Sequence, residues 1–229
     1  MTSAESRGTF VTLEGPDGSG KTTQIALLAD RLRQAGRAVV ITREPGGTPF
    51  GERVRDLLLG TDAAGIDPRT EVLLFCAART ELVTRVVVPA LAAGRIVVCD
   101  RYADATLAYQ GYGRGVDLAW ISALGRTVTG GLVPDRTVLL DLPVETGLAR
   151  RPAAEWNRLD AASLAFHRRV RAGYLALADR EPRRWVVVAA DRPRDDVAAD
   201  VLAALGDLPG LDFAGAAATH RMQSPLQEE

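Results

Sequence analysis

The chain has 229 residues, of which 47% are hydrophobic and 25% charged, values typical of a folded globular domain rather than a disordered or fibrous chain. A chain of this length can bury a sizeable core as one domain. The formal net charge of -1 argues against the broad basic surface that duplex nucleic acid requires, although a local basic cleft remains compatible with it. We therefore expect no nucleic-acid partner.

The cysteines and the apolar runs predict where the protein works. Cys76 and Cys99 lie among apolar residues without metal-ligand spacing, which favours buried thiols in a reducing compartment. The first ten residues lack an apolar signal core, and apolar runs such as residues 186–190 are too short to cross a bilayer. The sequence thus predicts a cytoplasmic protein with no membrane partner.

The beginning of the chain predicts a strand, a glycine loop and a helix. Residues 9–13 are β-branched and apolar, residues 15–20 are rich in glycine, and residues 22–34 carry apolar side chains at helical spacing. A second strand is predicted at 38–41, followed by a turn-rich loop at 43–48.

The middle of the chain continues the alternation of helices and strands. Helical patterning covers residues 50–59 and then 69 to about 93, where Pro89 is expected to kink or restart the helix. Buried-type strands follow at 96–99 and 138–141.

The last predicted elements are a strand at 185–189 and a helix at 193–205, whose first turn carries Asp195 and Asp196. Five strands separated by helices predict an α/β fold, a parallel sheet with helices on both faces. We expect a single domain over residues 1–206 and a disordered tail at 207–229.

One motif between the first strand and the first helix carries chemistry. Residues 15–22 match G-x-x-x-x-G-K-[ST], and Lys21 is the one lysine among 28 basic residues. Converging backbone N–H groups, the helix N-terminus and the lysine ammonium suit ATP-type phosphates. A glycine turn that matches by chance is the alternative. The residues predicted to bind ATP are Gly15, Pro16, Asp17, Gly18, Ser19, Gly20, Lys21, Thr22 and Thr23.

Carboxylates follow two of the predicted strands. Asp100 ends the strand at 96–99, which would place it beside the glycine loop at the carboxyl edge of a parallel sheet. Thr22 and Asp100 are the predicted Mg²⁺ residues, partly through water. Asp100 and Asp141 as plain strand-end turn residues are the alternative.

Six segments, in their order and spacing, resemble the bacterial thymidylate kinases of the P-loop nucleoside monophosphate kinases. They are residues 15–22, 43–48, 74–79, 100–102, 108–111 and 157–160. The resemblance covers about residues 8–206. It implies a P-loop NTPase-type three-layer α/β/α fold with a five-stranded parallel sheet and a short mobile lid, ATP as donor, dTMP as acceptor, Mg²⁺ as cofactor, and a homodimer.

The resemblance also implies where dTMP binds. Phe75 and Arg79 lie one helical turn apart, which suits stacking on a base and hydrogen bonding to its edge. Asp17 is expected to face the sugar 3′-hydroxyl, and Tyr109 to crowd the ribose 2′ position. The predicted substrate-binding residues are Asp17, Pro45, Arg55, Phe75, Arg79, Arg101, Thr106, Tyr109 and Gln110. Packing roles for Phe75 and for residues 106–110 are the alternative.

The charge over the transferring group is assigned to arginines. Arg55 and Arg101 can hold the acceptor phosphate from two sides. Because Gly18 stands where one type of thymidylate kinase has a loop arginine, the lid at about 150–160 is expected to supply the charge. The predicted catalytic residues are Lys21, Arg101, Arg158, Arg150 and Arg151.

Two other functions stay open at this point. Another small-molecule kinase of the same fold would act on a different nucleotide or on a nucleoside, and a P-loop ATPase module would act on a protein partner. A GTP-dependent switch needs an Asn-Lys-x-Asp segment, which a chain with Lys21 as its one lysine does not contain.

Overall fold

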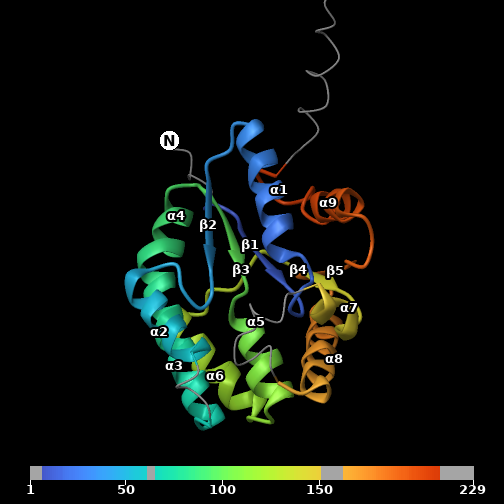
Figure 1. Cartoon of the computed structure of the whole chain (residues 1–229). Coiled ribbons are helices and arrows are strands. Elements are labelled where there is room, and N and C mark those ends of the chain that lie inside the picture. The colour runs from blue at the N-terminus through green and yellow to red at the C-terminus, as the bar shows by residue number, and fades with distance from the viewer. Residues whose placement is uncertain (1–6, 61–64, 151–161, 212–229) are drawn as a thin grey trace, which may run out of the picture.

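The computed structural model describes residues 7–60, 65–150 and 162–211, and its strands form one parallel sheet (Figure 1). The strand order is β2-β3-β1-β4-β5, so the strand that opens the glycine motif lies at the centre. The strands are β1 (Phe10–Glu14), β2 (Val39–Arg43), β3 (Ile96–Asp100), β4 (Arg136–Asp141) and β5 (Trp185–Ala189). The predicted five-stranded parallel sheet is confirmed.

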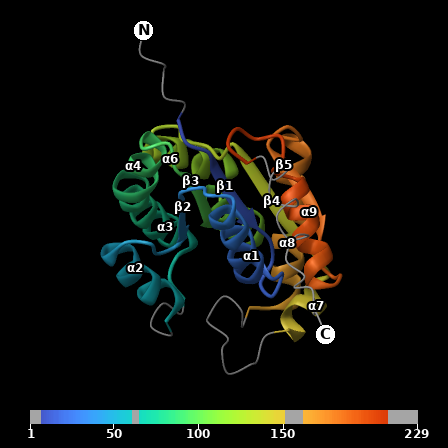
Figure 2. The same cartoon turned by 90° about the horizontal axis from the view of Figure 1, so that it is seen from above.

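Helices cover both faces of the sheet, which Figure 2 shows from above. On one face α1 (Lys21–Gln34) and α9 (Arg194–Ala203) pack against alternate residues of the strands, such as Val11 and Leu13. The other face buries Phe10 and Val97 under the π-helix η2 (Val83–Val87) and α4 (Val88–Ala92). This alternation is what a strand buried on both faces requires.

The remaining helices lie at the carboxyl edge of the sheet and beyond it. The π-helix η3 (Leu107–Gly113) and α8 (Leu164–Arg180) pack together over β4 and β5. The others are α2 (Pro49–Leu59), α3 (Pro68–Leu82), α5 (Ala103–Thr106), α6 (Leu118–Thr129) and α7 (Val144–Ala149). The sequence patterns specified neither α6, α7 nor α8.

The helix predicted from 69 to about 93 is divided into three parts. α3 passes into η2, and α4 begins before Pro89. Pro89 stands in the first turn of α4, where a missing backbone N–H breaks no hydrogen bond within that helix. The proline therefore marks a restart of the helix, as expected.

The end of the described chain packs against the domain. Leu205 and Leu211 are buried in the same cluster as α1 and α9, and Thr9 Oγ1 donates to the Pro209 carbonyl at 2.7 Å. Packing against the domain continues to residue 211, and residues 212–229 lie outside the described residues. The predicted boundary between domain and tail at residue 206 therefore stays a prediction. Within the described ranges, no helix is long and apolar enough to cross a membrane.

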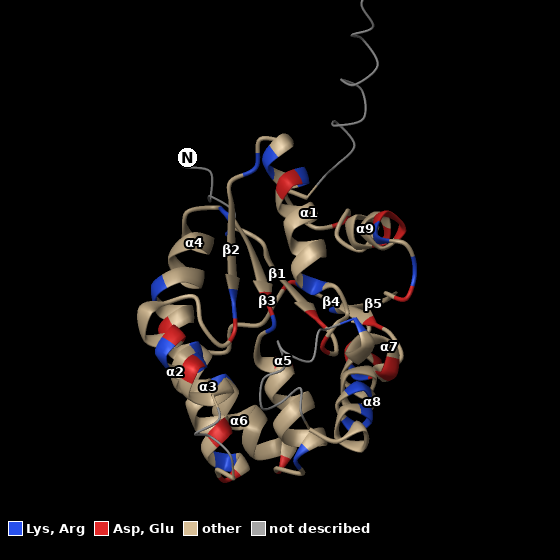
Figure 3. Ribbon diagram, viewed as in Figure 1, with Lys and Arg blue, Asp and Glu red and all other residues tan. Residues whose placement is uncertain are grey.

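The register of the sheet sets the position of the candidate site. Leu13 of β1 lies opposite Asp100 of β3, and Thr42 and Arg43 of β2 lie opposite Cys99 and Asp100. The loops that follow β1, β2 and β3 thus leave the sheet side by side. Acidic and basic segments meet at this edge (Figure 3).

Candidate active site

The glycine loop between β1 and α1 has the form that the motif predicts. Gly20 precedes α1 with a positive φ of 90°, and Lys21 opens the helix. The Lys21 ammonium donates to the carbonyls of Gly15 and Pro16, both at 3.0 Å, and to Ser19 Oγ at 3.4 Å. Burial, together with the charge of Arg101, lowers the pKa of Lys21 to about 8. The lysine is thus held inside the loop that its neighbours form.

A cavity of about 830 Å³ opens over this loop, and we call it the loop cavity. Seven of its lining residues belong to the predicted ATP set: Asp17, Gly18, Ser19, Gly20, Lys21, Thr22 and Thr23. Gly15 and Pro16 do not line the cavity; their carbonyls accept hydrogen bonds from Lys21. Seven further lining residues were not predicted: Gln24, Arg43, Glu44, Ala190, Arg192, Arg194 and Val197. Arg192 and Arg194 follow β5, so their position after a predicted strand could have identified them as candidate site residues.

The residues predicted to hold Mg²⁺ both line the loop cavity. Asp100 Oδ1 is buried and makes no hydrogen bond within the part of the chain that the structure describes. An orphaned carboxylate oxygen facing phosphate-binding groups fits a divalent cation that takes its other ligands from phosphate and water. Asp141 has a different role, since it forms a bidentate ion pair with Arg171 at 2.7 and 2.8 Å.

A second, smaller cavity of about 90 Å³ lies behind the first, and we call it the inner cavity. All nine residues predicted to bind the substrate line it, together with Glu44, Leu59, Tyr102 and Ala105. They come from the glycine loop, from the loops after β2 and β3, and from α2, α3, α5 and η3. The fold therefore gathers in one place the side chains that the sequence singled out over nearly one hundred positions.

Arg101 joins the two cavities, because it lines both of them. Its guanidinium donates to Asp17 at 2.7 Å and to the Tyr109 hydroxyl at 3.0 Å, and Tyr109 donates to the other Asp17 oxygen at 2.6 Å. Burial opposes the charge, but Tyr109, Tyr174 and Asp17 hold the pKa of Arg101 above its usual value. Asp17 lines both cavities, and its two oxygens are held by Arg101 and Tyr109.

The base-side end of the inner cavity is built around Arg79. Its side chain is fully buried, pairs with Glu44 at 2.8 Å and donates to Thr106 Oγ1 at 2.7 Å. Burial raises the pKa of Glu44 to about 7, although Arg79 opposes the shift. Gln110 donates to Glu71 at 2.9 Å, while its own Oε1 is buried and accepts no hydrogen bond from the described residues. Arg79 and Gln110 both line the inner cavity, the first with a guanidinium fixed by Glu44 and Thr106.

Arg55 and Phe75 complete the walls of the inner cavity. Arg55 donates to the Pro45 carbonyl at 3.0 Å and lines both cavities. Phe75 is half-buried and packs against Val54, Leu58 and Ala78, with part of its ring left for the cavity. Phe75 thus serves the local packing and the cavity wall together.

Three acidic or aromatic residues at or next to the site were not predicted from the sequence. Glu14 ends β1 fully buried, Glu44 sits where the two cavities meet, and Tyr174 projects from α8. Burial and the charge of Asp104 raise the pKa of Glu14 to about 8, against the opposing charge of Arg101. Glu14 carried the same strand-end signal as Asp100, whereas Tyr174 carried none because α8 was not predicted.

The lid arginines are described only in part. Arg150 lines the loop cavity and donates to the Ala190 carbonyl at 3.1 Å. Arg151 and Arg158 lie outside the described residues. Gly18 has a φ of 75°, and a Cβ built on it would lie 1.9 Å from the Gly147 carbonyl oxygen of α7. A loop arginine at this position would require the backbone of α7 to move.

A parallel sheet, a phosphate loop at its carboxyl edge and an adjoining second cavity define a P-loop nucleotide-binding protein of the small-molecule kinase class. The sequence model of the thymidylate kinase family matches residues 13–201. That match covers most of the chain, and the chain therefore belongs to the thymidylate kinase family of nucleoside monophosphate kinases.

Individual relatives agree with this assignment. The thymidylate kinase of Thermomicrobium roseum is 57% identical over 201 residues, covering 87% of this chain and 95% of that protein. The thymidylate kinase of Deinococcus radiodurans is 53% identical over 203 residues, covering 88% and 98%. The crystal structure of thymidylate kinase from Ehrlichia chaffeensis superposes with a TM-score of 0.71 at 37% identity, covering 87% of this chain and 98% of that one.

Proposed function

We propose that this chain transfers the γ-phosphoryl group of ATP to the 5′-phosphate of dTMP, giving dTDP and ADP. The observation that carries the proposal is the junction of the two cavities, which share Asp17, Glu44, Arg55 and Arg101. A donor held by the phosphate loop and an acceptor held in the inner cavity would meet at two arginines. Membership in the thymidylate kinase family supports the choice of dTMP.

On the donor side, the loop amides and Lys21 would hold the β- and γ-phosphates of ATP. Thr22 and Asp100 would hold Mg²⁺, partly through water, for the reasons of donor chemistry given above. When bound, the cation supplies charge stabilisation at the phosphate oxygens. Arg158 is proposed to place positive charge over the transferring group, with Arg150 or Arg151 assisting.

On the acceptor side, Arg55 and Arg101 would hold the dTMP phosphate, and Phe75 would stack on the base. Thymine offers one N–H donor and two carbonyl acceptors. The free Gln110 Oε1 and the Arg79 guanidinium supply the complementary groups at the base-side end of the inner cavity. Asp17 is proposed to face the sugar 3′-hydroxyl, and Tyr109 to crowd the 2′ position and so favour deoxynucleotides.

The transfer itself needs no general base, because the attacking oxygen belongs to a phosphate that is already ionised at neutral pH. Catalysis then consists of positioning two anions against each other and stabilising the charge between them. Arg55 and Arg101 both line the two cavities, which supports this role for them.

A coupled assay of ADP release tests the proposal, run with dTMP, dUMP, dCMP, dGMP, thymidine and no acceptor. We expect dTMP to give the highest kcat/KM and the reaction without acceptor to be slow. Preference for another acceptor would favour a different small-molecule kinase. ADP release that dTMP does not stimulate would favour an ATPase module and contradict the proposal.

We further propose that the protein works as a homodimer in the cytoplasm. Leu57 of α2, Leu73 of α3 and Trp120 of α6 are 51%, 51% and 37% exposed. These three helices pack in sequence, α2 on α3 and α3 on α6, at one side of the molecule (Figure 1). Exposed apolar side chains on neighbouring helices suit a self-complementary interface. Light scattering should give twice the chain mass, and Leu73→Glu should halve it.

A further inference from the structure

Arg101 lies in a backbone conformation that the chain must enforce. Its φ of 67° is the one positive value at a non-glycine residue within the described ranges. Such a conformation is unfavourable for an L-residue and persists where surrounding contacts fix it. The Arg101 N–H donates to the Leu13 carbonyl at 3.0 Å, and Cys99 Sγ donates to the Arg101 carbonyl at 2.9 Å.

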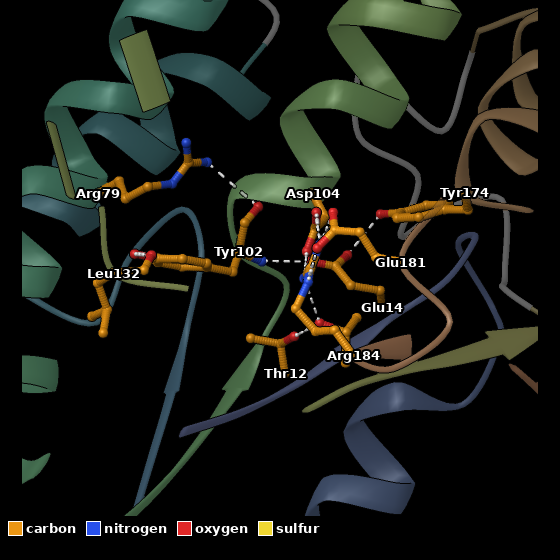
Figure 4. A network of polar contacts seen from close by, with 10 residues as sticks. Thr12, Glu14, Arg79, Tyr102, Asp104, Leu132, Tyr174, Glu181 and Arg184 are labelled. Carbon is orange, nitrogen blue, oxygen red and sulfur yellow. Dashed lines mark hydrogen bonds and ion pairs between the residues drawn. The ribbon is translucent and has the colours of Figure 1, made fainter. Parts of the chain in front are cut away.

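One buried carboxylate holds the chain directly after Arg101. The Tyr102 N–H donates to Glu14 Oε1 at 2.7 Å, and Glu14 is fully buried at the end of β1. Figure 4 shows this bond reaching Glu14 from the Tyr102 side. Glu14 therefore fixes the direction in which the backbone leaves Arg101.

The other oxygen of the same carboxylate is linked to the guanidinium of Arg101. The Tyr174 hydroxyl donates to Glu14 Oε2 at 2.8 Å, and it accepts a hydrogen bond from Arg101 Nη1 at 2.8 Å. Tyr174 approaches Glu14 from the side opposite Tyr102 (Figure 4). The hydrogen bonds run from Arg101 to Tyr174 and from Tyr174 to Glu14. All of these donors are satisfied when Glu14 is a carboxylate that accepts from both Tyr174 and Tyr102.

We propose that Glu14 and Tyr174 are positioning residues that set both the backbone and the guanidinium direction of Arg101 at the junction of the two cavities. The inference rests on the proposed function, in which Arg101 holds the acceptor phosphate. Neither residue lines either cavity, so both act through Arg101.

A neighbouring acid shows what a purely structural arrangement looks like in this fold. Asp104 is also buried, and Arg184 pairs with it directly through two hydrogen bonds of 2.6 and 3.0 Å. Glu14 forms no such direct ion pair with any residue that the structure describes, and it reaches a cation only through Tyr174. The carboxylate that lacks its own arginine is thus the one connected to the active-site arginine.

The test compares Glu14→Gln and Tyr174→Phe with Tyr112→Phe as the matched control. Glutamine keeps the shape of Glu14, but its NH₂ group would face either the Tyr102 N–H, which is also a donor, or the Tyr174 hydroxyl, which would then lose its acceptor. Tyr174→Phe removes the link to Arg101 and keeps the Glu14 bond to Tyr102. Tyr112 packs against Gly173 beside Tyr174, its hydroxyl has no partner among the described residues, and it lines neither cavity.

We expect Glu14→Gln and Tyr174→Phe to lower kcat at least tenfold and to raise the KM for dTMP. The KM for ATP should stay within threefold, and Tyr112→Phe should match the wild type. A calorimetric titration with dTMP in an Arg101→Ala background should show no further loss of affinity from Glu14→Gln, because residues that act through one group are not additive.

Failure of the inference and failure of the proposed function give different results. A wild-type protein that does not phosphorylate dTMP contradicts the function. If the wild type is active, kcat and dTMP KM values within twofold for Tyr174→Phe overturn the inference even where Glu14→Gln fails to fold. Equal loss of dTMP affinity from Glu14→Gln with and without Arg101 would also overturn it.

Discussion

The two cavities of this protein are built in different ways. The loop cavity, of about 830 Å³, takes much of its wall from consecutive residues, 17–24, at one turn between β1 and α1. The inner cavity, of about 90 Å³, is lined by side chains from the phosphate loop, two further loops and four helical segments. The first site is thus centred on one continuous segment, and the second is assembled from segments that are distant in sequence.

This difference determines how each site is stabilised. Backbone amides at a helix N-terminus are oriented by the local conformation and need few supporting contacts. The side chains of the inner cavity are long and polar, and each is fixed by a partner: Arg79 by Glu44, Tyr109 by Asp17, and Arg101 by Tyr174. Substitutions in the loop cavity should therefore act on phosphate charge, and those in the inner cavity on recognition.

The largest expected effect is at Lys21, whose ammonium group contacts the carbonyls of the phosphate loop. Lys21→Ala should lower kcat/KM about 10³-fold, because positioned charge at transferring phosphates is typically worth several kcal/mol. Steady-state kinetics and a thermal melt measure the loss and check that the variant folds. Arg33→Ala, exposed on the same helix, is the control and should be near wild type. Retention of more than about a tenth of the activity by Lys21→Ala would contradict the assignment.

The next effect separates the lid from the phosphate loop as the source of transition-state charge. Because Gly18 has no room for a side chain, Arg158→Ala should lower kcat by about 10²-fold while the KM for ATP changes little. Arg150→Ala and Arg151→Ala, measured in parallel, assign the assisting residue. If Arg158 only attracted ATP, its loss would raise KM at constant kcat, and salt would reproduce the effect in the wild type.

A third prediction concerns selectivity between the two cavities. Phe75→Ala should raise the KM for dTMP by 10- to 100-fold and leave the KM for ATP unchanged, since stacking on a base contributes about 1–3 kcal/mol. Leu74→Ala is the matched control, because Leu74 packs in the same cluster but does not line the inner cavity. Equal weakening for both substrates would assign Phe75 to the core.

The same contrast explains how far the sequence could be interpreted. The strand, glycine loop and helix around Lys21 could be predicted because motif and periodicity lie within about 25 residues of each other. The nine substrate-binding positions came from resemblance, and the structure places all nine around one cavity. Their roles toward dTMP stay predictions.

The connections between these residues could not be predicted. Tyr174 lies on α8, 160 positions from Glu14, and no local pattern links a tyrosine on one helix to a strand-end carboxylate. Gly147 shows the same limit. It must be glycine because the backbone of Asp17 and Gly18, which are distant in sequence, leaves no room for a side chain. Such close approaches depend on the three-dimensional packing of elements and leave no periodic signal.

The smallest expected effect tests this packing of the phosphate loop on α7. A Cβ at Gly147 would lie 2.5 Å from the Asp17 carbonyl oxygen, which belongs to the backbone and cannot rotate away. Gly125 of α6 is also helical, and a Cβ there meets no atom within 4 Å among the described residues. The two glycines therefore form a matched pair that differs in what the new methyl group contacts.

Alanine favours a helix over glycine by about 1 kcal/mol, so Gly125→Ala should stabilise the protein slightly and leave kcat unchanged. Gly147→Ala receives the same helical gain, but overpacking typically costs about 1–3 kcal/mol. We expect Gly147→Ala to be the less stable of the two in urea unfolding and to lower kcat several-fold, because the shifted Asp17 backbone carries the loop with it. Equal stability and equal kcat for the two variants would show that α7 yields to the methyl group, and the Gly18 contact with α7 would then no longer explain why the loop lacks an arginine.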